Sequence, residues 1–212
     1  MVKSDSQIKK RLLDIAYRYK LSHLGSFLSS IDIIDDILSN QKPEDIFILS
    51  SGHAALAMYV CNEKYFNIDA EKMFVKHGGH PHLDELNHIY CSTGSLGLGI
   101  TIAVGRAIAN PNRQVNVLIS DGECAEGSVW EALSLIHTLK LTNITVHVNI
   151  NGFSAYDVID VDYLKNKLIS FLPGIKLHHT TVEQFPFLIG LNAHYHIMSE
   201  TDYNTVTKNY AS

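Results

Sequence analysis

The sequence predicts an α/β fold with a mostly parallel sheet flanked by helices, and three observations support this fold class. Residues 115–119 and 144–150 are short runs rich in β-branched apolar residues, which is typical of buried strands. The segment between them, 126–141, has the apolar spacing of an amphipathic helix. A strand–helix–strand unit of this length forms a right-handed crossover between parallel strands. We therefore expect a single domain over residues 1–212.

In the N-terminal part of the chain, the pattern predicts two helices separated by an irregular stretch. Residues 4–7 (SDSQ) match a capping box, and the apolar spacing that follows predicts a first helix of about four turns. Gly25 and several serines interrupt the helical pattern between residues 21 and 30. A second helix is expected to begin near Asp32, because an acidic side chain suits the positive end of a helix.

The middle of the chain adds a strand, two helices and a long loop. Residues 46–49 (IFIL) predict a buried strand, and a helix is expected over 54–66. Residues 76–94 contain glycines and a proline and predict a loop. A glycine-containing helix is expected over 95–109. From residue 160 onward, short apolar runs alternate with turn residues and predict no clear element.

Composition and charge exclude several classes of protein. Charged residues make up 18% and hydrophobic residues 46% of the chain, which is a globular balance. The net charge of −5, with no basic block, argues against nucleic-acid binding. We expect no membrane span and no secretory signal, because no apolar run is long enough. The three cysteines are few and widely spaced, so we expect buried, unreactive thiols and a cytoplasmic location.

Two oxygen-bearing side chains follow the two strands of the predicted crossover. Asp121 comes directly after the first strand and Asn151 directly after the second, so both belong to the sheet edge where ligands bind. Oxygen ligands of this kind suit Mg²⁺, whose remaining positions would include phosphate oxygens of a cofactor. Gly122 permits a close approach of the backbone, and the helix near Glu126 directs its N-terminus at the same place. Taken alone, the Asp-Gly and Asn-Gly dipeptides are also ordinary turn signals.

Five segments, in the same order as in the family, resemble motifs of transketolases. The matching segments are 22–25 (SHLG), 49–54 (LSSGHA), 79–81 (GHP), 92–99 (STGSLGLG) and 120–127 (SDGECAEG), the last followed by Trp130-Glu131-Ala132 and Asn151. The fifth segment resembles the thiamine-diphosphate motif of the family. The resemblance implies the thiamine-diphosphate-binding fold with thiamine diphosphate and Mg²⁺ as cofactors.

The resemblance also implies roles for individual residues. Asp121, Asn151 and the backbone carbonyl of Phe153 would hold Mg²⁺. His23 and His80 would face the reacting carbons of a ketose. The residues implied at the cofactor are His53, Gly94, Ser95, Leu96, Gly122, Glu126 and His194. Among these, Glu126 resembles an acid that couples paired active sites, and His194 has the loosest match.

The remaining histidines and Trp130 are expected to be structural. Eight of the twelve histidines have no motif support, and we expect them in the core or on the surface. Neighbouring histidines such as His178 and His179 also fit a zinc site, but nothing in the sequence brings three or four ligands together. Trp130 and the apolar stripe of its helix are expected to face the sheet.

The sequence departs from the family pattern at several positions. Ser120 replaces the first glycine of the usual Gly-Asp-Gly, and Leu24 and Ser26 replace residues that are commonly Pro and Gly. Asn149 and Ile150 precede the ligand asparagine where other acidic or amide residues are frequent. The loop between residues 74 and 93 is short, which predicts a wider or differently shaped substrate entrance.

The resemblance predicts that the chain requires a partner. Thiamine chemistry needs a second domain that binds the aminopyrimidine ring, and residues after 160 do not resemble it. We therefore expect the N-terminal subunit of a split transketolase that transfers a two-carbon ketol unit from a sugar or sugar phosphate. Its C-terminal subunit would complete an α₂β₂ assembly. Two alternatives are the α subunit of a 2-oxo-acid dehydrogenase or decarboxylase, and a catalytically degenerate regulatory subunit.

Overall fold

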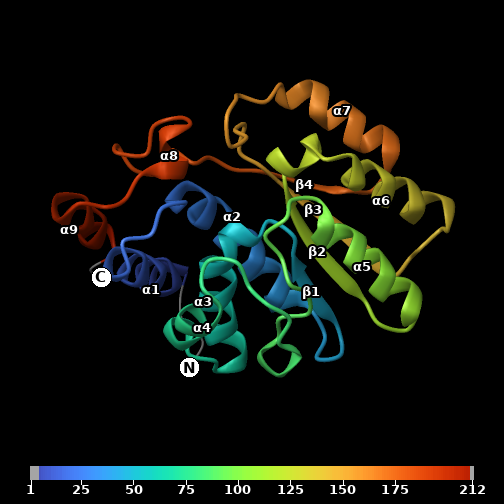
Figure 1. Ribbon diagram of the computed structural model, residues 1–212, viewed down its shortest axis with the longest axis horizontal. Helices are drawn as coiled ribbons and strands as arrows, with labels where there is room; N and C mark the ends of the chain where they lie inside the picture. Colours follow the sequence, from blue (N-terminus) through green and yellow to red (C-terminus); the bar gives the residue numbers. More distant parts are fainter. Residues whose placement is uncertain (1–4, 211–212) are drawn as a thin grey trace.

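A four-stranded parallel sheet forms the centre of the computed structural model, which describes residues 5–210 (Figure 1). The strand order is β1-β2-β3-β4, and each neighbouring pair is parallel. The strands are β1 (Ile46–Leu49), β2 (Val115–Ser120), β3 (Ile144–Ile150) and β4 (Lys176–His179). The predicted parallel α/β fold is confirmed, including the crossover between β2 and β3.

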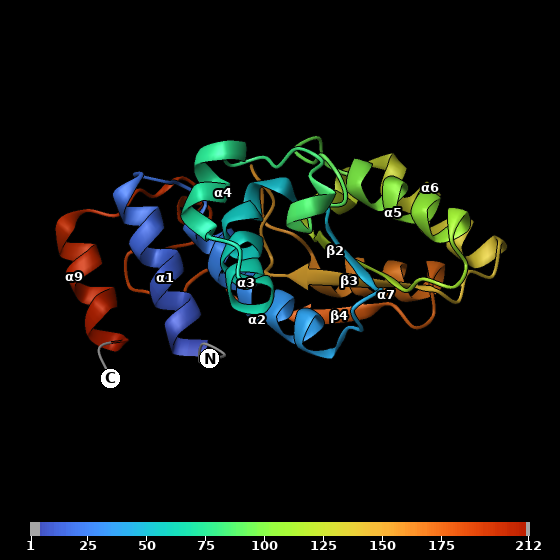
Figure 2. The same ribbon diagram turned by 90° about the horizontal axis from the view of Figure 1, so that it is seen from below.

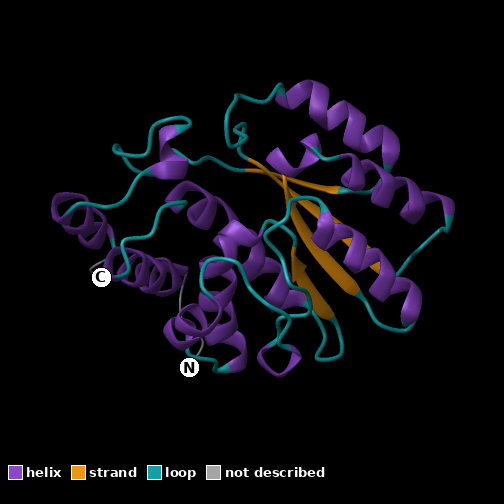
Figure 3. Ribbon diagram, in the orientation of Figure 1, coloured by secondary structure: helices purple, strands orange, loops and turns teal. Residues whose placement is uncertain are grey.

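Helices cover both faces of the sheet, as the purple and orange elements of Figure 3 show. One face packs against α5 (Leu98–Ala109), α6 (Gly127–Thr138) and α7 (Val161–Phe171). The other face belongs to a larger core that also contains buried residues of α1, α2, α3 and α4. Their bounds are α1 (Asp5–Arg18), α2 (Leu24–Asn40), α3 (Ala55–Phe66) and α4 (Ala70–His77).

The C-terminal segment returns to the N-terminal helices instead of extending the sheet. It contains the short helix α8 (Asn192–Tyr195) and α9 (Glu200–Asn209). Figure 2 shows α9 beside α1, far from the strands, and Tyr203 stacks on Tyr17 with ring centroids 4.2 Å apart. This return brings α8 to α2 and so to the carboxyl ends of the strands.

The start of α2 differs from the prediction. The helix begins at Leu24, not near Asp32, and residues 24–31 are buried. Gly25 is a packing position there, because a Cβ built on it would lie 2.8 Å from Cβ of Val182. The serines of this stretch find hydrogen-bond partners, for example Ser29 with the carbonyl of Ser26. Tertiary packing therefore overrides the low helix propensity of glycine and serine.

Other boundaries also differ from the prediction. The glycine-containing helix α5 begins at Leu98, because residues 94–97 form a loop in which Gly94 and Gly97 have φ of 147° and 78°. Short 3₁₀ turns precede α3 and α6: η1 (Gly52–Ala54) and η3 (Gly122–Ala125). A third, η2 (Glu85–Asn87), lies in the predicted loop. Helix α4 was not predicted, and the capping box at 4–7 includes a residue outside the described part of the chain.

The cysteines are free and buried, as the sequence predicts. Burial raises the pKa of Cys91 to about 11 and also raises the pKa values of Cys61 and Cys124, so the thiols are protonated and unreactive at neutral pH. Within residues 5–210, the helices are all too short or too polar to cross a membrane.

Candidate cofactor-binding site

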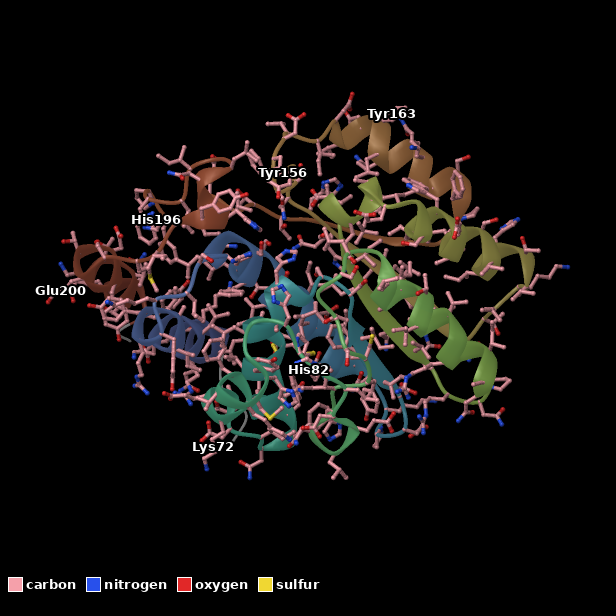
Figure 4. All side chains as sticks on the ribbon, in the orientation of Figure 1. Lys72, His82, Tyr156, Tyr163, His196 and Glu200 are labelled. Carbon is pink, nitrogen blue, oxygen red and sulfur yellow. The ribbon has the colours of Figure 1, made fainter. Side chains whose placement is uncertain are left out.

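A cavity of about 340 Å³ opens at the carboxyl ends of the strands. Its walls come from the turns after β1, β2 and β3, from the glycine loop of residues 94–97, and from the segment that contains α8. Figure 4 shows Tyr156 between the segment of α8 and the start of α7, and this side chain lines the cavity while remaining 88% exposed. Ligands bind at this edge in open parallel sheets.

Asp121 lies in the turn after β2 and connects the ends of two strands. Its Oδ2 accepts hydrogen bonds from the backbone N–H groups of Asn151 (2.8 Å) and Gly152 (2.7 Å). Its Oδ1 accepts one from the N–H of Gly122 at 3.0 Å. Burial raises the pKa of Asp121 to about 6, partly offset by these N–H groups. The structure thus brings Asp121 and Asn151 together, as the strand topology predicts.

The donor atoms around Gly122 suit a hard cation. The Oδ1 of Asn151 accepts a hydrogen bond from the N–H of Phe153 at 3.0 Å, which folds the 151–153 turn back toward Asp121. A Cβ built on Gly122 would lie 3.8 Å from the carbonyl oxygen of Phe153 and 3.3 Å from Cα of Ser154. A carboxylate, an amide oxygen and a backbone carbonyl thus belong to two adjoining turns, and oxygens of these kinds are the ligands that Mg²⁺ prefers.

The histidine-rich zinc alternative finds no support in residues 5–210. Within this part of the chain, no three or more His, Cys, Asp or Glu side chains are arranged to hold a metal ion. A cation near Asp121 would depend on oxygen ligands and on oxygens of a bound phosphate.

The glycine loop packs closely against two neighbouring segments. A Cβ on Gly52 would lie 2.8 Å from the backbone nitrogen of Gly94, and one on Gly94 would lie 3.1 Å from Cδ2 of His80. Gly94 and Leu96 line the cavity, as expected of cofactor contacts, but Ser95 is exposed and lies outside the lining. The Ser95 side chain is therefore not part of the cavity wall.

Glu123, an acid that the sequence patterns did not single out, is fully buried beside the cavity. Its Oε1 accepts hydrogen bonds from Oγ of Ser50 (2.7 Å) and from the N–H of Gly97 (2.9 Å). Its Oε2 accepts one from the N–H of Ser120 at 3.1 Å. Burial raises the pKa of this carboxyl, against the effect of its donors. Glu126, the acid that was predicted, is exposed and lies at the rim of the cavity.

Ser120 has a defined contact in place of the usual glycine. Its hydroxyl accepts a hydrogen bond from the N–H of Glu123 at 3.2 Å and so stabilises the turn that contains Asp121. Asn149 points away from the cation site: its Nδ2 donates to the hydroxyls of Ser29 and Ser30, and Thr180 donates to its Oδ1. This departure joins β3 to α2 through hydrogen bonds to Ser29 and Ser30.

Three histidines from distant parts of the sequence meet on one wall of the cavity. The ring centroids of His23 and His194 are 4.1 Å apart, and His53 lies 5.6 Å from His23 and 5.7 Å from His194. Burial lowers the pKa of His53 to about 3 and that of His23 to about 4, and it also lowers the pKa of His194. His23 and His53 are therefore neutral at physiological pH, each able to donate one hydrogen bond and accept another.

The backbone of His23 has an unusual conformation that α8 holds in place. His23 precedes α2 with φ of 69°, a left-handed value that few residues other than glycine adopt. Its N–H donates to the carbonyl of His194 at 2.8 Å, and its Nδ1 lies 2.7 Å from Oγ of Ser22.

His80 lies beyond this cluster, in a second cavity of about 190 Å³. His23 and His53 line both cavities, and Leu56 and Phe74 give the second one an apolar wall. The four histidines singled out from the sequence thus line two cavities that share His23 and His53.

Five of the other histidines have structural contacts, which agrees with the prediction. His77 and His196 bind Asp84 and Asp202, His88 stacks on Phe66, and His147 pairs with His178. The remaining three, His82, His137 and His179, are exposed.

The apolar stripe of α6 is buried against the sheet, as predicted. Trp130 itself is partly buried: it packs against the same core and contacts the ring of Phe171 of α7, outside the lining of the cavity. Its indole N–H donates to the carbonyl of Cys124 at 2.9 Å, just before its own helix.

Comparison with known proteins agrees with this geometry. The family described as "Transketolase, thiamine diphosphate binding domain" matches residues 35–162, which is more than half of the chain. The chain belongs to the transketolase family. The matched region contains the glycine loop, both cation-site strands and the three residues Asp121, Glu123 and Asn151.

Relatives of this transketolase-family chain include both separate subunits and longer proteins. Two proteins that are each named as one subunit of an apulose-4-phosphate transketolase match it. The one from Actinobacillus succinogenes is 32% identical, and the match covers 74% of this chain and 64% of that protein. The one from Phocaeicola vulgatus is 28% identical, and the match covers 77% of this chain and 66% of that protein. Human transketolase is 31% identical over 73% of this chain and 30% of its own length. The chain thus spans about two thirds of the two single-subunit relatives and less than a third of the human protein.

Solved transketolases share the fold. A transketolase from Leishmania mexicana superposes with a TM-score of 0.74 over all of this chain, at 20% identity, and 42% of its own length is covered. A second solved structure is a mutant transketolase from Pichia stipitis in complex with fructose-6-phosphate. It superposes with a TM-score of 0.74 at 18% identity, and the match covers 97% of this chain and 40% of that chain.

Proposed function

We propose that this chain is the cofactor-binding subunit of a two-subunit transketolase that transfers a two-carbon ketol unit from a ketose to an aldehyde acceptor. The observation that carries the proposal is one continuous site, in which Asp121 and Asn151 meet at the strand ends beside the cluster of His23, His53 and His194. Two relatives named as single subunits of a transketolase support the separate-subunit form.

In this proposal, Asp121, Asn151 and the carbonyl of Phe153 hold Mg²⁺ together with the diphosphate of thiamine diphosphate. Asp121 and the carbonyl of Phe153 both lie close to Gly122, and Gly94 and Leu96 of the glycine loop line the same cavity. Thiamine diphosphate, when bound, supplies the electron sink for cleavage of the carbon–carbon bond beside a ketone. His53 and His194 lie on the adjacent wall, where they pack against the cofactor.

His23 and His80 orient the sugar and hold its hydroxyl protons. Nδ1 of His23 is bound to Ser22, so we assign its Nε2 to a sugar hydroxyl. His80 approaches the same substrate from the second cavity, which is open to solvent. A neutral imidazole accepts a proton at one nitrogen while it donates from the other, which suits proton transfer to and from hydroxyl groups.

The residues that line the two cavities indicate which ligand groups the C-terminal subunit binds. Neither lining contains a lysine or an arginine among the described residues. Recognition of a sugar phosphate therefore falls to a separate C-terminal subunit, which also binds the aminopyrimidine ring and forms an α₂β₂ assembly with this chain. The buried, free cysteines suit a cytoplasmic location for the complex.

The Asp121→Ala and Asn151→Ala variants test the proposal. Each variant, co-expressed with the C-terminal subunit, should lose bound thiamine diphosphate, with the apparent Kd rising roughly 100-fold because a cation ligand is missing. Asp162→Ala is the control, because this side chain is 91% exposed on α7, away from the cavity. Full retention of cofactor by both variants contradicts the proposed cation site, and a wild-type complex that releases CO₂ from 2-oxo acids but leaves ketoses intact contradicts the proposed reaction.

A further inference from the structure

Three segments that are distant in the sequence meet at one buried carboxylate. Ser50 follows β1 and lies 73 residues from Glu123, and Gly97 ends the glycine loop 26 residues away. Ser120 ends β2, next to Asp121. All three donate to Glu123, at 2.7, 2.9 and 3.1 Å, and the Glu123 side chain is fully buried.

Further hydrogen bonds extend this junction in both directions. The hydroxyl of Ser50 donates to Glu123 and also accepts from the N–H of Ile100 at 3.2 Å, which connects the first turn of α5. The N–H of Glu123 donates to Oγ of Ser120 at 3.2 Å, so Glu123 and Ser120 are joined by two hydrogen bonds around Asp121. The carboxylate thus contacts the three loops that form one side of the cavity without itself lining it.

We propose that Glu123 is a positioning residue for the diphosphate: it sets the distance between the glycine loop and the Asp121 turn, and so determines how tightly these two loops hold Mg²⁺–diphosphate. This inference rests on the proposed function, because it places the diphosphate between the two loops. The carboxylate does not touch the ligand, and its effect passes through the backbones of Gly97 and Ser120.

A carboxylate is the side chain that suits these donors. Three N–H or O–H groups converge on two oxygens, and only an acid of this length offers two acceptor atoms. A glutamine has the same volume but one acceptor, so its amide NH₂ would face a backbone N–H of either Gly97 or Ser120. Hydrogen bonds to a buried charged group are also stronger than neutral ones, which holds the loops more rigidly.

The test compares Glu123→Gln and Ser50→Ala with Glu44→Gln, a control of the same chemistry on an exposed residue ahead of β1. Calorimetric titration of the full chain with Mg²⁺ and inorganic diphosphate measures Kd. Hydrogen exchange followed by mass spectrometry measures protection of the backbone N–H groups of Gly97 and Ser120. The thermal midpoint Tm of each variant shows that the titration is carried out on folded protein.

We expect Glu123→Gln to raise the Kd about tenfold and Ser50→Ala to raise it about threefold, because each variant loses part of a charge-assisted set of hydrogen bonds. Exchange should become faster at Gly97 or Ser120 in Glu123→Gln, and Glu44→Gln should match the wild type in all three measurements. A lower Tm with an unchanged Kd would show that Glu123 only stabilises the fold, and this overturns the inference while the proposed function stands. If the complex of the wild-type chain with its C-terminal subunit binds neither Mg²⁺–diphosphate nor Mg²⁺–thiamine diphosphate, the proposed function fails and the inference fails with it.

Discussion

The two ends of the candidate site are held together by different forces. At the cation end, Asp121 and Glu123 accept six hydrogen bonds from fixed backbone and hydroxyl groups. At the histidine end, His23, His53 and His194 contact one another mainly through their rings. The cation end is therefore fixed by directional hydrogen bonds, whereas the histidine end depends on ring contacts that allow more than one arrangement.

The largest effect is expected from Gly97→Ala, which tests the rigidity of the cation end. Gly97 has φ of 78°, and a Cβ there would lie 2.9 Å from Cβ of Glu126 and collide with Ser128. We expect a loss of about 3 kcal/mol or more in the free energy of unfolding, measured in urea. Gly105→Ala is the matched control in the adjoining α5: its Cβ meets no atom within 4 Å, so helix propensity predicts a gain of about 0.5–1 kcal/mol. Equal effects of both substitutions would show that the loop adapts easily.

The second prediction concerns pH and the neutral His53 of the histidine end. Because burial lowers the pKa of His53 to about 3, the unfolded chain binds more protons than the folded chain as the pH falls below about 6.5. Stability is therefore retained above that pH and decreases below it, by up to about 2 kcal/mol from His53 alone at pH 5. Urea unfolding at pH 5 and pH 7.5 measures the difference, which should become smaller in His53→Gln. An unchanged pH dependence in that variant would show that His53 is accessible to water and protonates normally.

A smaller loss is expected from Asp84→Ala in the loop that contains His80. Asp84 accepts hydrogen bonds from Lys76, His77 and Asn87, and these lower its pKa to about 2, with Lys76 as the largest cause. Removing them should cost about 1–2 kcal/mol of stability and loosen residues 78–92, which hydrogen exchange would detect. The exposed Asp162→Ala should change stability by less than about 0.5 kcal/mol. Unchanged exchange in the loop would mean that the Tyr59 hydroxyl, which donates to the carbonyl of Gly78, is sufficient to hold it.

The smallest effect on cofactor binding is expected from His80→Ala, which separates the two ends most clearly. His80 lines the second cavity and not the first, so the Kd for thiamine diphosphate should change less than about threefold, while turnover of the complex falls by about 100-fold. His82→Ala, two residues away and exposed, is the control and should retain full turnover. Normal turnover in His80→Ala would remove this residue from the active site.

The features that follow from local pattern and strand topology were predictable. The β2–β3 crossover required only two apolar runs and the helix between them, and the rule for parallel strands then placed Asp121 beside Asn151. The order of the motifs indicated His23, His53 and His80, although nothing in their local sequence shows that they share a wall. Burial of the three cysteines likewise followed from their number and spacing.

The features that depend on contacts between distant residues were not predictable. The sequence around Gly25 is typical of an interrupted helix, and only the approach of Val182 explains why a glycine is needed inside α2. Glu123 looks like one more acid in a polar turn until Ser50 and Gly97 are folded onto it. The segment after residue 160 shows weak periodicity because its last part packs on α1 and α2 through a few aromatic residues, such as Tyr203 on Tyr17.

The hydrogen bond from the N–H of His23 to the carbonyl of His194 has a consequence for synthesis of the chain. It joins residues near the beginning and the end of the described sequence, and it holds a backbone conformation that costs about 1–3 kcal/mol when unsupported. During translation, β1, β2, β3 and the Asp121 turn are synthesised before the segment of α8. The wall that contains His23 and His194 is completed only after residue 194 has emerged, so it forms later than the strands and the Asp121 turn.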